Sequence, residues 1–434
     1  MQSIFRSRSA LLVTLLAFVL AAATPTVASA VPKPGAKAQR GFRLFARSLG
    51  AMTINRIYCG LSSDGQICVD STNSSTIGGG YWPKGTADQY VFNTGLQLAG
   101  IIDVDGGAWA GDTTGAFFFD PKGTTQHGLE VRPIYNMNIP ADFAEVDADP
   151  LHPARVPGGL DPQAALFEQV LQGRVSASQG DIWFMSWDGD PGQAAGRPHP
   201  LGVVVETRGL GWNYPSGNED LLYYIYTFYN VTSTNRSDYE AQNIRSGMVD
   251  ILVEKAQEFQ SRNNAAFGIT LPSGGYTINP LFAAFGTDMD VASAGTNWAG
   301  VILPFALGTT YDGAFDRFQG WTFDPAIFSK PFFAGSGFVG VKYLKSPTGP
   351  GAIQLYSNTI NGGEFDDPQN TTQLYRYLSG QISVAAGDAP CNSGDPKLSR
   401  ICFLNNNTHD DMRFFQSSTP LSLGPGASGT IVVS

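Results

Sequence analysis

The stretch LLYYIYTFYNVTS, residues 221–233, decides the fold of this chain. Large apolar and aromatic residues occupy alternate positions on both faces of an extended backbone: Leu222, Tyr224, Tyr226 and Phe228 on one face, and Leu221, Tyr223, Ile225, Tyr229 and Val231 on the other. A strand with two apolar faces is covered on both sides, as at the centre of a sandwich whose outer face carries a further layer. The stretch therefore predicts a central strand of a β-sandwich.

Similar runs recur along the chain and are separated by turn residues. They span residues 66–70, 89–102, 115–120, 181–187, 201–208, 247–254, 298–305, 337–345 and 429–434. Glycine, proline, asparagine, aspartate and serine between them supply the positive φ angles and the local hydrogen bonds that turns require. Strands do not alternate with helices, which disfavours a parallel α/β sheet. We expect an all-β fold, an antiparallel β-sandwich of the jelly-roll or immunoglobulin-like kind.

One or two short helices are expected beside the strands. Residues 161–173 begin with Asp161 as an N-cap and end at Gly173. A second helix is expected over residues 372–380, TQLYRYLSG. Within the strand-like run 89–102, Gly95 predicts a bulge or a close approach of another backbone.

The first thirty residues have the pattern of a cleavable signal peptide. Arg6 and Arg8 form a basic start, residues 10–23 are almost wholly apolar, and residues 28–30 form an A-x-A cleavage site. Residues 31–45 are polar and are interpreted as a flexible lead-in. No later run reaches the ~18 apolar residues of a membrane helix. We expect an exported protein, secreted or at the cell surface, with no membrane-spanning segment after the signal peptide.

The β-sandwich region is expected to span residues 46–434. Its length allows two packed subdomains, with a boundary near residues 233–262. The ending LSLGPGASGTIVVS, residues 421–434, is typical of strand, Pro-Gly turn and strand, and it stops inside an apolar alternation at Ser434. We expect the chain to be the N-terminal portion of a longer open reading frame.

Charge and cysteine content narrow the function classes. The formal net charge is −10, so few groups are available to neutralise phosphates, and we expect no nucleic-acid partner. The four cysteines form two local pairs, Cys59 with Cys68 and Cys391 with Cys402. In the oxidising compartment that the signal peptide implies, two short-range disulfides are the simplest of the possible connectivities.

Closely spaced aspartates are candidate metal ligands. GTDMDV carries Asp288 and Asp290, and WDGDPG carries Asp188 and Asp190. Calcium prefers several hard oxygen ligands, which an Asp-x-Asp step in a loop supplies. The alternative is that each aspartate caps its own turn. The sequence predicts a structural Ca²⁺ site, first at Asp288 and Asp290 and then at Asp188 and Asp190; no motif predicts another cofactor.

No catalytic residue can be assigned from a motif. The chain has no G-x-S-x-G elbow, and all four cysteines are paired in this interpretation. His152 and His199 adjoin prolines in loop sequence, where we expect exposed side chains. The specific alternative is a glycan-active site of the two-carboxylate kind. Its candidate residues are Glu206, Glu219, Asp220 and Glu364, with Trp183, Trp187 and Trp212 as sugar platforms.

Four motifs resemble one group of proteins. They are WPKGTADQYVFNTGLQLAG at residues 82–100, the aromatic stretch 221–233, GTDMDV at 286–291 and the ending L-x-L-x-P-G-x-S-x-T-I-V-V. Together they resemble the N-terminal region of large uncharacterised secreted β-sandwich proteins of Gram-negative environmental bacteria. The resemblance implies a secreted or surface β-protein without an established activity. The segment 254–284 is longer than in that group, and the group's downstream modules are missing from the sequence.

Three functions stay open on the sequence alone. The favoured one is a structural or adhesive role at the cell exterior, with a surface protein, a matrix protein or a glycan as the partner. The second is a glycan-active or glycan-binding protein, and the third is a calcium-dependent binding module. An enzyme is the less favoured outcome, because strands, turns and disulfides account for most of the chain.

Overall fold

A computed structural model describes most of the chain beyond residue 48. The described residues are 49–62, 64–68, 79–86, 88–117, 132–133, 178–192, 197–244, 246–291, 295, 297–312, 338–348, 355–362, 367–391, 401–404 and 411–434. All of them belong to one compact unit, residues 43–434. The predicted signal peptide, the whole lead-in 31–45 and the predicted helix 161–173 lie outside the described residues.

Two β-sheets form the body of this unit. Sheet A has ten strands among the described residues, eight of which run in the order β1 (Leu49–Met52), β2 (Tyr58–Ser62), β3 (Gly80–Tyr81), β4 (Gln89–Asp103), β10 (Thr277–Met289), β16 (Met412–Ser418), β14 (Leu355–Gly362) and β15 (Ile401–Phe403). The other two are β5 (Thr113–Phe117), which pairs with β4, and β17 (Leu421–Leu423), which pairs with β10. Pairing is antiparallel except between β14 and β15.

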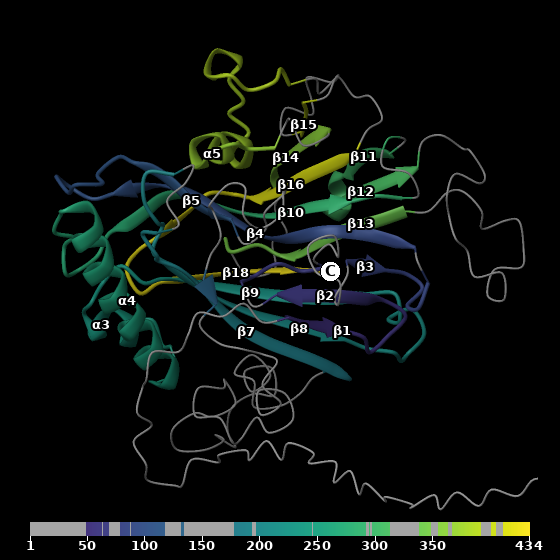
Figure 1. Cartoon of the computed structure of the whole chain (residues 1–434), viewed down its shortest axis with the longest axis horizontal. Helices are drawn as coiled ribbons and strands as arrows, with labels where there is room; N and C mark the ends of the chain where they lie inside the picture. The colour runs from purple at the N-terminus through teal and green to yellow at the C-terminus, as the bar shows by residue number, and fades with distance from the viewer. Residues whose placement is uncertain are drawn as a thin grey trace, which may run out of the picture. The chain divides into compact units, whose positions relative to one another are not determined.

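Sheet B packs against sheet A and is antiparallel throughout its described part. Its eight strands run in the order β11 (Asn297–Ile302), β12 (Leu307–Asp312), β13 (Phe338–Lys345), β18 (Ser428–Val433), β9 (Leu222–Asn230), β8 (Val203–Gly211), β7 (Gly180–Asp188) and β6 (Arg132–Pro133). Figure 1 shows β18 at the centre of this sheet, between β13 and β9. The prediction of an all-β antiparallel sandwich is confirmed.

The centre of the sandwich is built from the aromatic stretch that the sequence singled out. β9 turns its alternate residues Leu222, Tyr224, Tyr226 and Phe228 into the buried core between the sheets. Its other face is only half-buried at Tyr223, Ile225 and Thr227 and becomes buried from Tyr229 onward. The expectation of full cover on both faces is therefore wrong for the first part of the strand. Tyrosine and threonine tolerate this position, because their hydroxyl groups can face water while the rest of the side chain packs.

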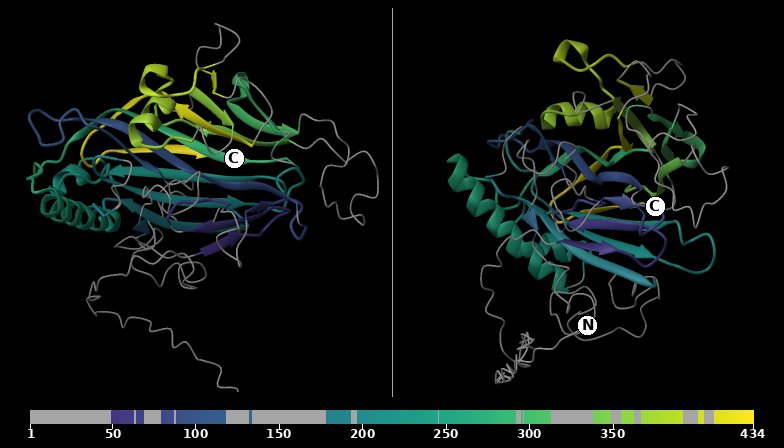
Figure 2. Two further views of the ribbon diagram at one scale, coloured as in Figure 1. Left: turned by 45° about the horizontal axis from the view of Figure 1, so that its top comes forward. Right: turned by 45° about the vertical axis from the view of Figure 1, so that its right-hand side comes forward.

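β4 is the strand of sheet A that is covered on both sides. Leu96 and Leu98 belong to the core between the sheets, whereas Ala99 belongs to a second core beneath helix α5 (Thr371–Ser379). Figure 2 shows α5 over the outer face of sheet A. At the predicted special position, Gly95 lies directly opposite Gly286 of β10 in an unbroken register. The predicted bulge does not fall at Gly95, because the register shifts lie towards the two ends of the pair, and the alternative of a close backbone approach stays a prediction.

The structure corrects two strand predictions. Residues 247–254 are the first part of helix α4 (Ser246–Phe267), which follows the short helix α3 (Arg236–Glu240). Their valines and isoleucine favour a strand by residue type. The apolar positions nevertheless continue at helical spacing, and Met248, Val249, Leu252, Ala256 and Phe259 are all buried. Within 66–70, the described residues form only isolated bridges, from Ile67 to Leu61 and Thr94.

Local signals predicted the smaller elements well. α5 begins after Asn370, whose side chain accepts a hydrogen bond from the Gln373 N–H, and ends at Gly380 with φ of 72°. Short 3₁₀ turns occupy Leu303–Phe305 and Val384–Ala386. Both predicted disulfides, Cys59–Cys68 and Cys391–Cys402, are present. No helix among the described residues is long and apolar enough to cross a membrane.

Asn230 joins the end of β9 to two neighbouring segments and gives a test of this arrangement. Its buried amide donates to the carbonyl oxygens of Tyr276 and Leu423 at 2.8 and 2.9 Å, and its oxygen accepts from the Thr232 N–H. Asn230→Ala leaves these buried groups without partners, so we expect a loss of about 3 kcal/mol in the free energy of unfolding, measured by denaturant titration.

The matched control is Asn235→Ala, since Asn235 is exposed and makes no side-chain capping bond at α3. We expect the control to change stability by less than about 0.5 kcal/mol. Equal effects of the two substitutions would contradict the role given to Asn230.

Candidate functional site

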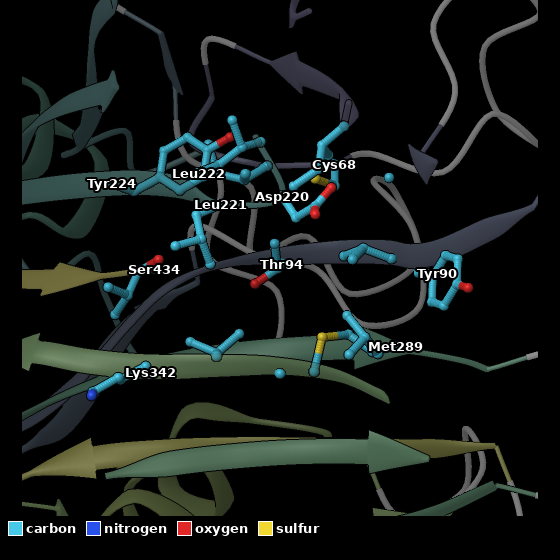
Figure 3. A pocket seen from close by; sticks show the side chains of 18 of the residues that line it. Cys68, Tyr90, Thr94, Asp220, Leu221, Leu222, Tyr224, Met289, Lys342 and Ser434 are labelled. Carbon is cyan, nitrogen blue, oxygen red and sulfur yellow. The ribbon is translucent and has the colours of Figure 1, made fainter. Parts of the chain in front are cut away.

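A large pocket opens between the two sheets and is the main candidate site. Its volume is about 800 Å³, and its lining comes from both sheets. Sheet A supplies Ile67, Thr94, Phe285 and Met289. Sheet B supplies Leu222, Tyr224, Val339, Val341 and Val433, with Ser434 directly after β18. Figure 3 shows Ser434 with Leu221 and Leu222 on one side, the strand that carries Lys342 on the other, and Thr94 further in.

Lys342 lines the pocket, and three further polar groups there, those of Thr94, Tyr224 and Tyr90, are held in a neutral or bonded state. The Thr94 hydroxyl donates to the Gly286 carbonyl oxygen at 2.7 Å. Burial raises the pKa of Tyr224 far above its usual value, and its hydroxyl lies 3.3 Å from the Cys59 sulfur. Burial, followed by the charge of Asp88, also raises the pKa of Tyr90. These groups supply neither a base nor a nucleophile at neutral pH, so the pocket is built for apolar contact.

The rim of the pocket contains one carboxylate, Asp220, which already has two partners. The Trp82 indole N–H donates to it at 2.6 Å and Arg56 at 3.1 Å. The Arg56 guanidinium also lies 5.3 Å from the centre of the Trp82 ring. The turn that begins the 82–100 motif therefore closes one side of the pocket, and Lys84 within it is exposed, as a scaffold role predicts.

The glycan candidates are not brought together at this pocket. Glu206 is buried and accepts hydrogen bonds from the Trp183 indole at 2.8 Å and from the Tyr229 hydroxyl at 3.1 Å. Glu219 bonds the Gly217 backbone N–H, and Glu364 lies outside the described residues. Asp220 is thus the one carboxylate among the lining residues, whereas glycoside hydrolysis requires two across a cleft.

An acidic cluster surrounds the end of β10 and contains the favoured metal candidates. Carboxylate oxygens of Asp288, Asp290 and Asp411 all lie within 4.8 Å of one another, the one such group of three among the described residues. The sequence motif pointed to the first two. Asp411 is more than a hundred residues away and joins them because Arg413 of β16 stands opposite Asp288 in the β10–β16 register.

A guanidinium already serves as a cation in this cluster. Arg413 is buried, and its Nε lies 3.0 Å from Asp288 Oδ2 and its Nη2 lies 3.1 Å from Asp411 Oδ2. Its Nη1 lies 3.8 Å from Asp367 Oδ2. Burial, followed by the charges of Asp288 and Asp411, raises the pKa of Asp290 to about 8, with Arg413 opposing the shift. Arg413 therefore balances the charged carboxylates while Asp290 holds a proton at neutral pH.

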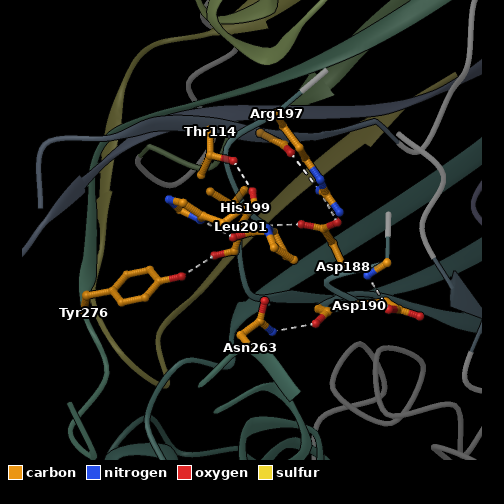
Figure 4. Close-up of polar contacts among 12 residues, drawn as sticks. Thr114, Asp188, Asp190, Arg197, His199, Leu201, Asn263 and Tyr276 are labelled. Carbon is orange, nitrogen blue, oxygen red and sulfur yellow. Dashed lines mark hydrogen bonds and ion pairs between the residues drawn. The ribbon is translucent and has the colours of Figure 1, made fainter. Parts of the chain in front are cut away.

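The second metal candidate, Asp188 with Asp190, has a different environment. The Asp188 carboxylate pairs with the buried Arg197 and accepts the Leu201 N–H at 2.7 Å, as Figure 4 shows. Asp190 accepts the Gly192 N–H at 2.8 Å, which is the turn-capping alternative that the sequence left open. The calcium prediction for this pair is not tested, but its two carboxylates are engaged by separate partners.

His199 corrects an expectation from the sequence. Its side chain is fully buried, and its ring stacks on Trp109 with centroids 3.8 Å apart. Burial lowers its pKa to about 4, so the imidazole is neutral at physiological pH. The neighbouring prolines suggested an exposed loop, whereas the Trp109 ring supplies an apolar partner that no local pattern indicates. His152 lies outside the described residues.

Asp290 gives a pH test of the acidic cluster. Its folded pKa of about 8 lies above the ~3.9 of an unfolded aspartate, so the folded chain binds a proton that the unfolded chain has lost. Stability is therefore highest below about pH 4 for this group and falls as pH rises toward 8. Relative to Asp290→Asn, we expect the free energy of unfolding to decrease by up to about 1.4 kcal/mol per pH unit in this window. If the free energy of unfolding depends on pH in the same way in the unmodified chain and in Asp290→Asn, the raised pKa of Asp290 is contradicted.

The calcium prediction for Asp288 and Asp290 is tested by removing the competing cation. Arg413→Gln leaves buried carboxylates uncompensated, and we expect it to cost about 3 kcal/mol or more in stability. Calcium should then raise the melting temperature of this variant more than that of the unmodified chain. If the melting curve in calcium is identical to the curve in chelator for each of the two chains, a metal site at the cluster is excluded.

No protein-family model matches this chain, and no curated protein matches its sequence. The resemblance to the N-terminal region of large secreted β-sandwich proteins therefore stays a prediction.

Proposed function

We propose that this protein is an exported structural or adhesive module of the cell exterior, and that it holds its partner through the pocket between its two sheets. The partner is a surface or matrix protein with an apolar segment. Export follows from the signal-peptide pattern of residues 1–30. The resemblance to secreted β-sandwich proteins belongs to the same proposal.

The single observation that carries the proposal is the character of the pocket. About 800 Å³ lies within the range of ligand-binding cavities, and its walls are mainly aliphatic and aromatic. A cavity of this kind that opens to solvent leaves apolar surface uncovered, and such surface is typical of a binding site. Thr94 and Asp220 are hydrogen-bonded, and burial raises the pKa of Tyr224 and Tyr90, so the chemistry of the lining supports binding better than catalysis.

The two alternatives have less support from the described residues. A glycan-active site needs a second carboxylate, and Asp220 stands alone in the lining. A calcium-dependent module needs the Asp288 cluster to accept an ion, and Arg413 already contacts two of its three carboxylates. The calcium alternative leaves the apolar pocket without a role, and the glycan alternative lacks a second carboxylate within it.

Filling the pocket tests the proposal. Val339 is half-buried and lines the pocket, so Val339→Trp places an indole inside it. We expect the variant to bind the apolar fluorophore 1-anilinonaphthalene-8-sulfonate about tenfold more weakly than the unmodified chain, as measured by fluorescence titration. Beads coated with the variant should also be retained less on the surface of the producing cells.

Ile302→Trp is the matched control. Ile302 lies in the same sheet, is 44% exposed and does not line the pocket. We expect the control to keep both binding and retention. Loss of fluorophore binding and cell retention in the control as well would refute the proposed function. Unchanged binding and retention in both variants would also refute it.

A further inference from the structure

The turn between β11 and β12 contains no polar side chain. Ile302 pairs with Leu307 across this hairpin, and residues 303–306 connect the two strands. Residues 301–307 have the sequence VILPFAL, whereas a turn that faces water commonly carries glycine, asparagine, aspartate or serine. The sequence of this turn therefore suits an apolar environment better than it suits water.

The same turn nevertheless lies on the surface of the protein. Phe305 is 60% exposed, Ile302 is 44% exposed, and Pro304 between them is exposed as well. Single apolar side chains on a surface are common, but several at the end of one turn are unfavourable unless they have a function. These three residues, Ile302, Pro304 and Phe305, are called the apolar tip below.

Backbone contacts restrain the position of the apolar tip. Ala306 has a φ of 49°, a left-handed conformation that glycine or asparagine adopts more readily. Its carbonyl oxygen accepts a hydrogen bond from the Tyr343 N–H of β13 at 2.9 Å. The turn is thus bonded to the strand beside it in sheet B (Figure 1). An ordered turn of this kind loses little conformational entropy when it binds a partner.

Two lysines of β13 lie beside the apolar tip. The Lys342 ammonium is 5.9 Å from the centre of the Phe305 ring. From Lys342, which pairs with Leu307, β13 continues in the direction of the turn to Lys345. Both lysine side chains are exposed, and neither forms a salt bridge with a described residue. They are the charged side chains that the structure describes on β11, β12 and β13, so the described charge beside the tip is positive.

The acidic cluster is too distant to neutralise these lysines. Asn297, the first residue of β11, donates to Asp290 at 3.4 Å, whereas Ile302 is the last residue of the same strand. Five strand steps separate the two residues, a distance of about 17 Å. At physiological ionic strength, exposed charges are largely screened beyond about 8 Å. The positive charge beside the apolar tip therefore acts locally, although the chain has a net charge of −10.

We propose that the apolar tip inserts into an anionic lipid surface, with Lys342 and Lys345 against the lipid phosphates. This inference goes beyond the proposed function, since it gives the exported protein a second contact, by which it is held at a membrane. Apolar and aromatic side chains enter the boundary between headgroups and acyl chains, and basic residues beside them attract anionic headgroups. The net negative charge of the chain keeps the rest of the molecule away from such a surface.

The size and charge of the apolar tip favour lipid over a protein partner. A stable protein interface takes about 800 Å² from each partner. Three side chains at the end of a hairpin offer only a fraction of that area. A second copy of the chain would also bring the lysines of the two copies together, and like charges repel. A lipid layer closes around a single inserted side chain, so it requires no complementary surface.

An added tryptophan tests the insertion directly. The chain is used as the producing cells export it, and Ile302→Trp places an indole at the apolar tip, where it favours the membrane interface. The vesicles contain phosphatidylglycerol and brominated phosphatidylcholine in equal parts, because bromine quenches indole fluorescence on contact. After subtraction of the spectrum of the unmodified chain, we expect these vesicles to lower the emission of the added indole about twofold or more.

Tyr214→Trp is the matched control. Tyr214 is 73% exposed in the connection between β8 and β9, which also carries the carboxylates Glu219 and Asp220. We expect the indole added there to keep its emission with the same vesicles. Equal quenching of the two added indoles would overturn the proposal, and so would an emission of Ile302→Trp that the vesicles leave unchanged.

Vesicle sedimentation measures the apolar and the charged contributions separately. Phe305→Ser removes the aromatic ring, and we expect it to weaken binding to vesicles of phosphatidylglycerol and phosphatidylcholine about tenfold. Lys342→Gln and Lys345→Gln should each weaken this binding about fivefold. On vesicles of phosphatidylcholine alone, the two lysine substitutions should have no effect. Binding to the anionic vesicles that is the same in Phe305→Ser, or in both lysine variants, as in the unmodified chain would overturn the proposal.

The pocket variant separates this inference from the proposed function. Neither Ile302 nor Phe305 lines the pocket, and Val339 lies outside the apolar tip. We therefore expect Val339→Trp to lose the fluorophore and keep vesicle binding, and Phe305→Ser to lose vesicle binding and keep the fluorophore. If Val339→Trp loses vesicle binding as fully as Phe305→Ser does, the contact with lipid belongs to the pocket and the assignment to the apolar tip is refuted.

Discussion

The face-to-face packing of β9 on the β4–β10 pair is the interaction on which the rest of the structure depends. Tyr226 of β9 is fully buried, and its ring lies 5.8 Å from that of Phe285 on β10. Sheets pack about 10 Å apart, a distance that large aromatic side chains span by interdigitation. Direct hydrogen bonds also cross the layers, from the Tyr343 hydroxyl to the Gln416 carbonyl oxygen and from the Asn230 amide to the Leu423 carbonyl oxygen, each at 2.9 Å. Burial of apolar side-chain surface between the sheets mainly stabilises the sandwich, and its polar groups fix how the two sheets align.

Buried charge adds a second constraint at the periphery of the core. Arg413 and Arg197 are each buried beside an aspartate. Arg413 contacts Asp288, which is distant in sequence, and Arg197 contacts Asp188, which lies nine residues earlier in the chain. Taking such charges from water is costly unless they are paired and bonded, so each arginine restricts the chain to arrangements that bring its aspartates close. The raised pKa of Asp290 follows from its burial and, after that, from the nearby charges of Asp288 and Asp411. These clusters account for the aspartate-rich motifs as parts of the fold.

The candidate site arises where the inter-sheet packing stops. Ile431 and Val433 of β18 lie in the core, and the pocket lining beside them combines residues of β4, β9, β10 and β13. The apolar lining residues Ile67, Phe285 and Met289 are almost fully buried, so the pocket borders the buried core directly. Its carboxylate, Asp220, is bonded to Trp82 and Arg56.

The sequence alone was sufficient for the elements that depend on local patterns. Period-two alternation identified β4, β9 and β18, the stretch that ends at Gly380 identified α5, and cysteine spacing identified both disulfides. It failed at residues 247–254, because β-branched residues favour a strand and only the long-range burial of one helical face decides for α4. It also misplaced His199, whose burial depends on a ring ninety residues away in sequence.

Only the tertiary structure decided the sites. Asp411 joins Asp288 through the pairing of β10 with β16, and the pocket combines β4, β9, β13 and β18, which no spacing in the sequence relates. The physical reason is that strand register and sheet order are set by the packing of the whole core, whereas propensity and alternation act over a few residues. The sequence determined that this chain is a β-sandwich; the order of its strands determined which residues line the pocket between the sheets.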